Sequence, residues 1–246
     1  MHPVLFKIGP LTLYTYGLFL AIAFMVGFWL AERRAFDLKR HISNIAVLIF
    51  VSGIIGARIF NAISNPSSYS FIDVFISRSG FTFHGGLIFA IISVWIYCKK
   101  KGLPFLKIAD IFSPSFAIGM SIGRIGCFFE GCCFGKPTSL PWGILFPVGS
   151  WGWKRFGNIP LHPTQLYSSL LDFILFLILI KIKPKRNGFL FFSFLLGYSI
   201  IRFFVEFLRD QPLFLFSLTQ PQVVFFIVGI IISIIWFLYG KNKQSI

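Results

Sequence analysis

The sequence predicts an all-α integral membrane protein with seven transmembrane helices and a small extracytoplasmic head segment. Of its 246 residues, 56% are hydrophobic, and the mean hydropathy is +0.81. A soluble domain of this length has a lower apolar share. The chain also holds seven apolar runs, each near the ~20 residues that a helix needs to cross a bilayer. No internal repeat or soluble domain interrupts them, so residues 1–246 are predicted to form one polytopic membrane domain.

The predicted spans alternate with short basic loops. The spans are residues 14–32, 44–63, 83–99, 110–128, 163–181, 188–208 and 219–239. Three of the loops and the C-terminal tail, all on one side, hold fourteen of the 23 Lys and Arg residues, and six lie on the other side. Because cytoplasmic loops are enriched in Lys and Arg, the N-terminus is expected to face out and the C-terminus in. Membrane topology therefore accounts for most of the net charge of +15, and nucleic-acid binding is not predicted.

Residues 130–161 are predicted to form the extracytoplasmic head segment. Proline, glycine and tryptophan are frequent in this stretch, which is typical of irregular chain at a membrane interface. Simple interfacial anchoring would explain the tryptophans.

Three arginines, Arg58, Arg124 and Arg202, fall inside predicted spans. An arginine at the bilayer centre costs ~2.5–3.5 kcal/mol on the insertion scale, so each needs a reason. Pairing with carbonyls and acids of neighbouring helices is one explanation, above all for Arg58. Arg124 lies in GRIG, residues 123–126, where the glycines allow close approach to the backbone. Its planar fork of donors suits a lipid phosphate, and a glycine-packed helix pair is the alternative.

The sixth predicted span carries a polar stripe. Tyr198, Arg202, Glu206 and Arg209 are spaced i, i+4, i+8 and i+11, which places them on one face of a helix. Glu206 can pair with both arginines, which lowers the cost of burying all three charges. A polar stripe on an apolar helix must face a cavity or partner helices. The pattern fits either a purely structural ion-pair ladder or the lining of a binding site.

Two histidines are candidates for chemistry. His84 begins the third predicted span and is followed by Gly85 and Gly86, which would leave room for a ligand beside the imidazole. An unperturbed pKa near 6.5 suits a general base at neutral pH. His162 precedes Pro163 at the start of the fifth span, where a role in beginning the helix is as plausible as catalysis.

Motifs along nearly the whole chain resemble those of the prolipoprotein diacylglyceryl transferase family of the bacterial inner membrane. They are GPLTLYTYGL at 9–18, GARIF at 56–60, GFTFHGGL at 80–87, GRIG at 123–126, HPTQLY at 162–167, the Tyr198–Arg209 spacing and SLTQ at 217–220. One such motif would be weak, but the set occurs in order on seven predicted spans.

The resemblance implies transfer of the diacylglyceryl group of phosphatidylglycerol to the lipobox cysteine of a prolipoprotein signal peptide. The products would be a thioether and glycerol 1-phosphate. It implies His84 as the base, with Arg124 and Arg202 stabilising charge on the phosphate. Further residues are expected to bind substrate: Tyr16, Arg58, Gly85, Gly86, Glu130, His162, Gln165, Tyr198, Glu206 and Arg209. The head segment would admit the lipoprotein peptide. The expected protein is a multi-pass monomer of the inner membrane that uses no cofactor and no metal.

The match is less complete after GRIG, where the family usually continues with Asn-Phe and then Asn-Gly-Glu. Here Cys127 stands at the first asparagine position, Glu130 at the second and Cys132 at the glutamate position. Ser168 follows HPTQLY, where the family often has glutamate. These departures affect the expected headgroup contacts and hence the identity of the donor lipid.

Cys127, Cys132 and Cys133 allow several interpretations. Small buried apolar packing is the simplest. A disulfide is the second, because thiols on the outer side of a membrane can be oxidised. A catalytic thiol is a third. The absence of a matching set of histidines predicts no metal site.

Two other functions remain open from the sequence. A sister enzyme on the same scaffold would use another lipid donor or another thiol or hydroxyl acceptor. A non-catalytic lipid-binding or transport protein would have kept the arginines to hold headgroups.

Overall fold

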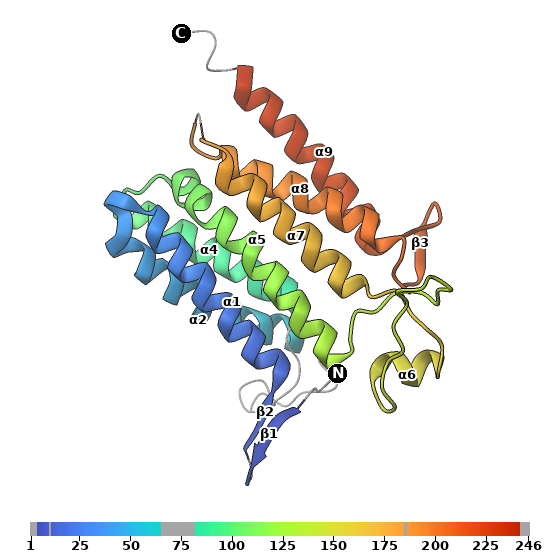
Figure 1. The fold of residues 1–246 in the computed structure, drawn as a ribbon. Helices are drawn as coiled ribbons and strands as arrows, with labels where there is room; N and C mark the ends of the chain where they lie inside the picture. Colours follow the sequence, from blue (N-terminus) through green and yellow to red (C-terminus); the bar gives the residue numbers. More distant parts are fainter. Residues whose placement is uncertain (1–3, 10, 65–81, 185, 242–246) are drawn as a thin grey trace. The chain divides into compact units, whose positions relative to one another are not determined.

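A computed structural model describes residues 4–9, 11–64, 82–184 and 186–241, and within them the chain is mostly helical (Figure 1). Each of the seven predicted spans coincides with one long helix. These helices are α1 (Thr15–Arg34), α2 (Lys39–Ser64), α4 (Phe83–Lys101), α5 (Phe105–Glu130), α7 (Thr164–Lys181), α8 (Phe189–Glu206) and α9 (Gln220–Lys241).

Five of these helices, within the described ranges, are long and apolar enough to cross a membrane: α1, α2, α5, α7 and α8. The protein is therefore a multi-pass membrane protein. The shorter elements are the 3-10 turn η1 (Phe36–Leu38), the helix α6 (Trp151–Phe156) and two antiparallel pairs. The pairs are β1 (Val4–Ile8) with β2 (Leu11–Tyr14), and β3 (Leu213–Leu215) with β4 (Leu218–Thr219). The sequence predicted an all-α protein, and these two short antiparallel sheets correct that prediction in a minor part of the chain.

The chain divides into two compact units, residues 31–109 and residues 1–30 with 110–246. In the first unit, α2 and α4 pack closely through glycines. A methyl group added to Gly85 would lie 2.5 Å from the Gly56 carbonyl oxygen, and one added to Gly86 would lie 2.8 Å from that of Gly53. Such distances leave no room for a side chain, so the small residues let the two helix backbones meet.

In the second unit, α5, α7 and α8 share an apolar core and are joined by polar contacts. The buried core residues are Ala117, Leu175, Leu179, Leu190 and Phe194. Ser121 of α5 and Ser169 of α7 each donate a hydrogen bond to the other's carbonyl oxygen, at 2.8 and 2.9 Å. These reciprocal bonds fix the register of α5 against α7, one turn away from Arg124.

The start of α8 is held by a carboxylate from α5. Asp110 accepts hydrogen bonds from the backbone N–H groups of Gly188 and Phe191, at 2.7 and 2.8 Å. A carboxylate beside the free N–H groups of a helix N-terminus is stabilising. Helix α9 then lies along α8 (Figure 1) and contacts it through aromatic pairs such as Tyr198–Phe225. The polar stripe of α8 is therefore enclosed by protein on more than one side.

Candidate functional site

Arg124 lies at the centre of a buried polar cluster in the unit formed by residues 1–30 and 110–246. Its guanidinium interacts electrostatically with the Tyr198 side chain of α8. It is also within electrostatic range of Cys127, Cys133 and Asp172. Helices α5, α7 and α8 and the loop after α5 thus all contribute to the surroundings of one guanidinium. The structure brings together Arg124 and Tyr198, two of the residues singled out in the sequence.

The ion-pair ladder predicted for the sixth span is confirmed. Arg202 Nη2 and Arg209 Nη1 each lie 3.2 Å from the same oxygen of Glu206, Oε2. Glu206 is 1% exposed, and Arg202 is 8% exposed and lies over the ring of Phe225. Two cations share one carboxylate, so the ladder carries an excess positive charge in a buried place.

Several buried polar atoms of the ladder and of α7 have no hydrogen-bond partner among the described residues. They are Arg202 Nη1, Arg209 Nε, Glu206 Oε1, Gln165 Oε1 and both carboxylate oxygens of Asp172. Buried polar groups are nearly always satisfied by protein or by water, and each unsatisfied one costs about 1–3 kcal/mol. These atoms are available for hydrogen bonds to water or to a polar ligand.

Asp172 is the residue that sequence reasoning missed. It lies in the middle of α7, is 1% exposed and is within electrostatic range of Arg124 and Arg202. The signal was present in the sequence, because Asp172 is the single charge in an otherwise apolar run from Leu170 to Ile180. An ionisable residue within a transmembrane segment is by default a candidate for function.

The loop after α5 is held in place by the HPTQ motif at the start of α7. Gln165 Nε2 donates a 2.6 Å hydrogen bond to the Cys132 carbonyl, and Thr164 Oγ1 donates a 2.7 Å bond to the Cys133 carbonyl. Cys133 has a φ of 60°, a left-handed conformation that non-glycine residues seldom adopt. The amide nitrogen of Gln165 thus bonds to this loop. The expected contact of Gln165 with substrate remains a prediction.

The three thiols that follow GRIG converge. The Sγ atoms of Cys127, Cys132 and Cys133 lie within 4.8 Å of one another, and all three cysteines are free. Hydrogen bonds from Cys127 and Cys132 lower the pKa of the Cys133 thiol below its ordinary value, and Arg209 and Arg124 lower it further. Burial acts in the opposite direction. The cluster favours a thiolate at Cys133.

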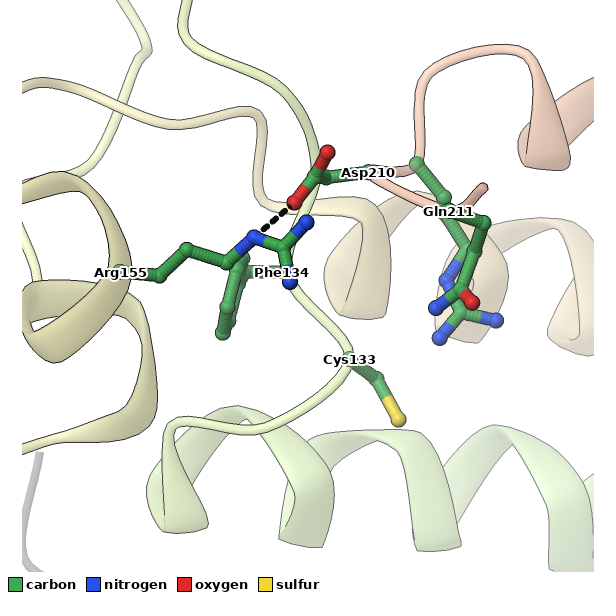
Figure 2. Close-up of a pocket in the computed structure, with 6 residues that line it drawn as sticks. Cys133, Phe134, Arg155, Asp210 and Gln211 are labelled. Carbon is green, nitrogen blue, oxygen red and sulfur yellow. Dashed lines mark ion pairs between the residues drawn. The ribbon is translucent and has the colours of Figure 1, made fainter. Parts of the chain in front are cut away.

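A small pocket opens next to Cys133 (Figure 2). Its lining residues are Cys133, Phe134, Arg155, Arg209, Asp210 and Gln211. Arg155 of α6 forms an ion pair with Asp210, and the Cys133 side chain points away from that pair (Figure 2). The pocket therefore joins the head segment, the end of α8 and the cysteine loop.

The head segment is fastened to the C-terminal end of α8. The Lys136 backbone N–H donates to the Leu208 carbonyl at 2.8 Å, and Lys136 Nζ donates to the Phe207 carbonyl at 3.0 Å. A methyl group on Gly135 would lie 2.5 Å from the Leu208 carbonyl oxygen, so only glycine fits this approach. These contacts position Arg209, which pairs with Gly135 in a β-bridge.

His162 takes part in the head segment rather than in the buried cluster. Its Nδ1 lies 3.3 Å from the Tyr167 hydroxyl, which also accepts a 2.8 Å hydrogen bond from Trp142. The backbone of His162 bonds to Gly135 and Lys136. These contacts give it a structural role, and its binding of substrate stays a prediction.

Two other predicted site residues belong to the same unit. Tyr16 of α1 is 37% exposed and is within electrostatic range of Arg124 and the three cysteines. A methyl group added to Gly126 would lie 3.2 Å from the Tyr16 ring, so a residue larger than glycine would crowd Tyr16 at this position. Glu130 ends α5 and forms no ion pair with any residue the structure describes.

Four predicted site residues lie in the unit of residues 31–109. Arg58 is on α2, and His84 is in the first turn of α4, where its side chain lies outside what the structure describes. Packing against α2 accounts for Gly85 and Gly86, since α2 fills the room that they were expected to leave. Their contact with a ligand, like the role of His84 as base, stays a prediction.

Comparison with known proteins gives a consistent result along nearly the entire chain. The family profile described as prolipoprotein diacylglyceryl transferase matches residues 3–239. The phosphatidylglycerol–prolipoprotein diacylglyceryl transferase of Clostridium tetani is 37% identical over 259 residues, with both chains covered completely. The protein of the same name from Pseudoalteromonas atlantica is 34% identical over 268 residues, covering 100% of this chain and 92% of its own. That from Finegoldia magna is 35% identical over 248 residues, covering 95% of each chain.

Proposed function

Because the chain belongs to the prolipoprotein diacylglyceryl transferase family, we propose that it transfers diacylglyceryl from phosphatidylglycerol to a prolipoprotein. The acceptor is the thiol of the lipobox cysteine in the signal peptide. The new bond is a thioether, and the leaving group is glycerol 1-phosphate. The protein is an enzyme of the transferase class, and its own residues supply the chemistry.

The buried cluster around Arg124 carries this proposal. A phosphate ester leaves with developing negative charge, and preorganised cations in a site that excludes water stabilise such charge strongly. Arg124, Arg202 and Arg209 supply three guanidiniums against the carboxylates of Glu206 and Asp172. Unused donors on Arg202 and Arg209 are available to a phosphate oxygen. Tyr198 and Tyr16 border the same cluster and orient the headgroup.

The acceptor thiol must lose its proton before it attacks the glycerol carbon. We assign this step to His84 on its chemistry. A histidine near pKa 6.5 that deprotonates a thiol near 8.5 leaves a transfer uphill by about 3 kcal/mol. Positive charge close to the acceptor thiol would favour its thiolate and offset that difference. The carbon–oxygen bond to the phosphate breaks as the carbon–sulfur bond forms.

The membrane arrangement follows from the loop charges. All seven long helices cross the inner membrane, with the N-terminus outside and the C-terminus in the cytoplasm. The head segment, residues 130–161, lies on the outer side, where the signal peptide presents its cysteine. The enzyme acts as a monomer that is solvated by the lipid bilayer.

A reconstituted assay tests the function. Purified protein, phosphatidylglycerol and a lipobox peptide are mixed in liposomes, and the peptide mass and released glycerol phosphate are followed. The expected result is a mass gain of one diacylglyceryl group on the cysteine, with one glycerol phosphate per transfer. His84→Ala should abolish both signals. No transfer by folded protein, while an active family member works in the same liposomes, would contradict the proposal.

The cysteine loop supports a second candidate, a sister enzyme with another donor lipid or acceptor. Cys127, Cys132 and Ser168 stand where the family usually has amide or acidic residues. Release of a different headgroup, or transfer to a serine in place of cysteine in the peptide, would favour it. If the protein binds lipid tightly but neither releases a headgroup nor modifies the peptide, a non-catalytic lipid-binding protein would be favoured.

Asp172→Asn is expected to lower kcat by about 5- to 100-fold with a smaller change in KM. The substitution keeps the shape of the side chain but removes the negative charge that lies near Arg124 and Arg202. The loss of a buried interaction to a charged group is worth about 1–3 kcal/mol. Steady-state kinetics in the reconstituted assay measure it. Asp210→Asn, at the pocket rim, is the matched control, and an equal effect of both variants would argue against a special role for Asp172.

A further inference from the structure

The thiol cluster is not used by the proposed transfer reaction. Cys127 comes from the last turn of α5, and Cys132 and Cys133 come from the loop that follows. The fold supplies this convergence, because Thr164 and Gln165 hold the Cys133 and Cys132 carbonyls and Cys133 adopts a left-handed backbone. The Cys132 thiol is oriented by a 3.7 Å contact with the Cys127 carbonyl. Contacts to the backbone carbonyls of the three cysteines thus bring their sulfur atoms together.

The spacing suits a metal ion better than a disulfide. A metal held by three thiolates at about 2.3 Å in a plane places its sulfurs about 4.0 Å apart. The three Sγ atoms lie within 4.8 Å of one another, so a small adjustment would complete such a triangle. A disulfide needs about 2.05 Å and would use only two of the three thiols.

Two positively charged side chains lie near the cluster. Arg124 and Arg209 are both within electrostatic range of Cys133, and Arg124 is also within range of Cys127. Three thiolates and a monovalent ion carry two net negative charges, and the two guanidiniums offset part of them, because Arg209 also pairs with Glu206. No histidine or carboxylate joins the cluster within the described part of the chain, so the site offers three ligands. Zinc sites normally have four ligands, whereas soft thiolates select ions such as Cu(I).

We propose that Cys127, Cys132 and Cys133 form a three-thiolate site for one soft cation of the Cu(I) class. Each thiol that is still protonated gives up its proton when its metal–sulfur bond forms, and no oxidation or reduction takes place. The sequence alone predicted no metal site, because no histidines accompany the cysteines.

Occupancy also has a consequence that rests on the proposed function. Arg124 and Arg209 would be engaged with the thiolates and less available to a lipid phosphate. The metal is therefore expected to inhibit transfer. Binding is measured without substrate, so its result does not depend on whether the protein transfers diacylglyceryl.

The test is Cu(I) titration of the full-length protein in detergent, without oxygen, with a thiol-free reductant and a chromogenic Cu(I) chelator as competitor. The expected result is one Cu(I) per chain with three sulfur neighbours in X-ray absorption. Cys127→Ser, Cys132→Ser and Cys133→Ser should each weaken binding at least 100-fold. Cys98→Ser is the matched control, because Cys98 is a buried free thiol in the other unit.

Several outcomes would overturn the proposal. They are unchanged binding in any of the three variants, loss of binding in Cys98→Ser, two sulfur neighbours instead of three, or Zn(II) binding as tight as Cu(I). A disulfide within the cluster that withstands the reductant would also overturn it. If a serine variant fails to fold, the sulfur count in the unaltered protein still decides the matter.

Discussion

Arg124→Lys is expected to lower kcat for diacylglyceryl transfer by about 100- to 1,000-fold. Removing one preorganised donor that faces developing negative charge costs about that much in enzymes studied by mutagenesis. Lysine keeps the positive charge but loses the planar fork that can contact Tyr198 and a phosphate together. The reconstituted assay measures the rate, and the peptide mass reports the product.

The matched control for this prediction is Arg40→Lys. Arg40 is an exposed arginine in the first turn of α2, and its replacement changes the same functional group outside the cluster. Thermal unfolding of both variants separates a folding defect from a catalytic one. A folded Arg124→Lys protein with the rate of the unaltered enzyme would remove Arg124 from the mechanism.

Glu206→Gln is expected to destabilise the protein by about 3–5 kcal/mol. Removing one partner of a buried ion pair leaves uncompensated charge, and here two guanidiniums share the lost carboxylate. The unfolding temperature in detergent should therefore fall sharply. The double variant Glu206→Gln/Arg202→Met should recover part of the loss, because it removes one of the two stranded cations.

Glu130→Gln is the control for this second prediction. It makes the same chemical change at the end of α5, where the carboxylate has no ion pair with a described residue. Its unfolding temperature should stay close to that of the unaltered protein. Equal stability of Glu206→Gln and Glu130→Gln would show that the ladder on α8 contributes little to the fold.

Much of the fold could be predicted because helix formation in a membrane is a local requirement. Every backbone polar group must be satisfied within its own segment, so each long apolar run becomes a helix. The Glu206 ladder was predictable for the same reason, since residues three and four apart on a helix are neighbours. The hairpin of β1 and β2 and the pair of β3 and β4 were missed, because these strands are short and their pairing depends on turns rather than on hydropathy.

The glycines show where a local motif is ambiguous. Gly85 and Gly86 after His84 suggested room for a ligand, yet α2 occupies that space. A glycine in the sequence indicates only that another group comes close to the backbone there. Whether that group is a ligand or a neighbouring helix depends on which helices pack together. Gly135 is the same case outside the helices, where the approaching group is the Leu208 carbonyl.

The sequence by itself determined the helices, the polar stripe of α8 and the family, because these depend on spacing along the chain. Tertiary structure alone decided that Asp172 lies near Arg124 and Arg202, and that Thr164 and Gln165 hold the cysteine loop. It also decided that three thiols meet beside two guanidiniums. The physical reason is that helix packing sets the distances between residues of different helices, and that Thr164 and Gln165 of α7 anchor the loop that carries Cys132 and Cys133.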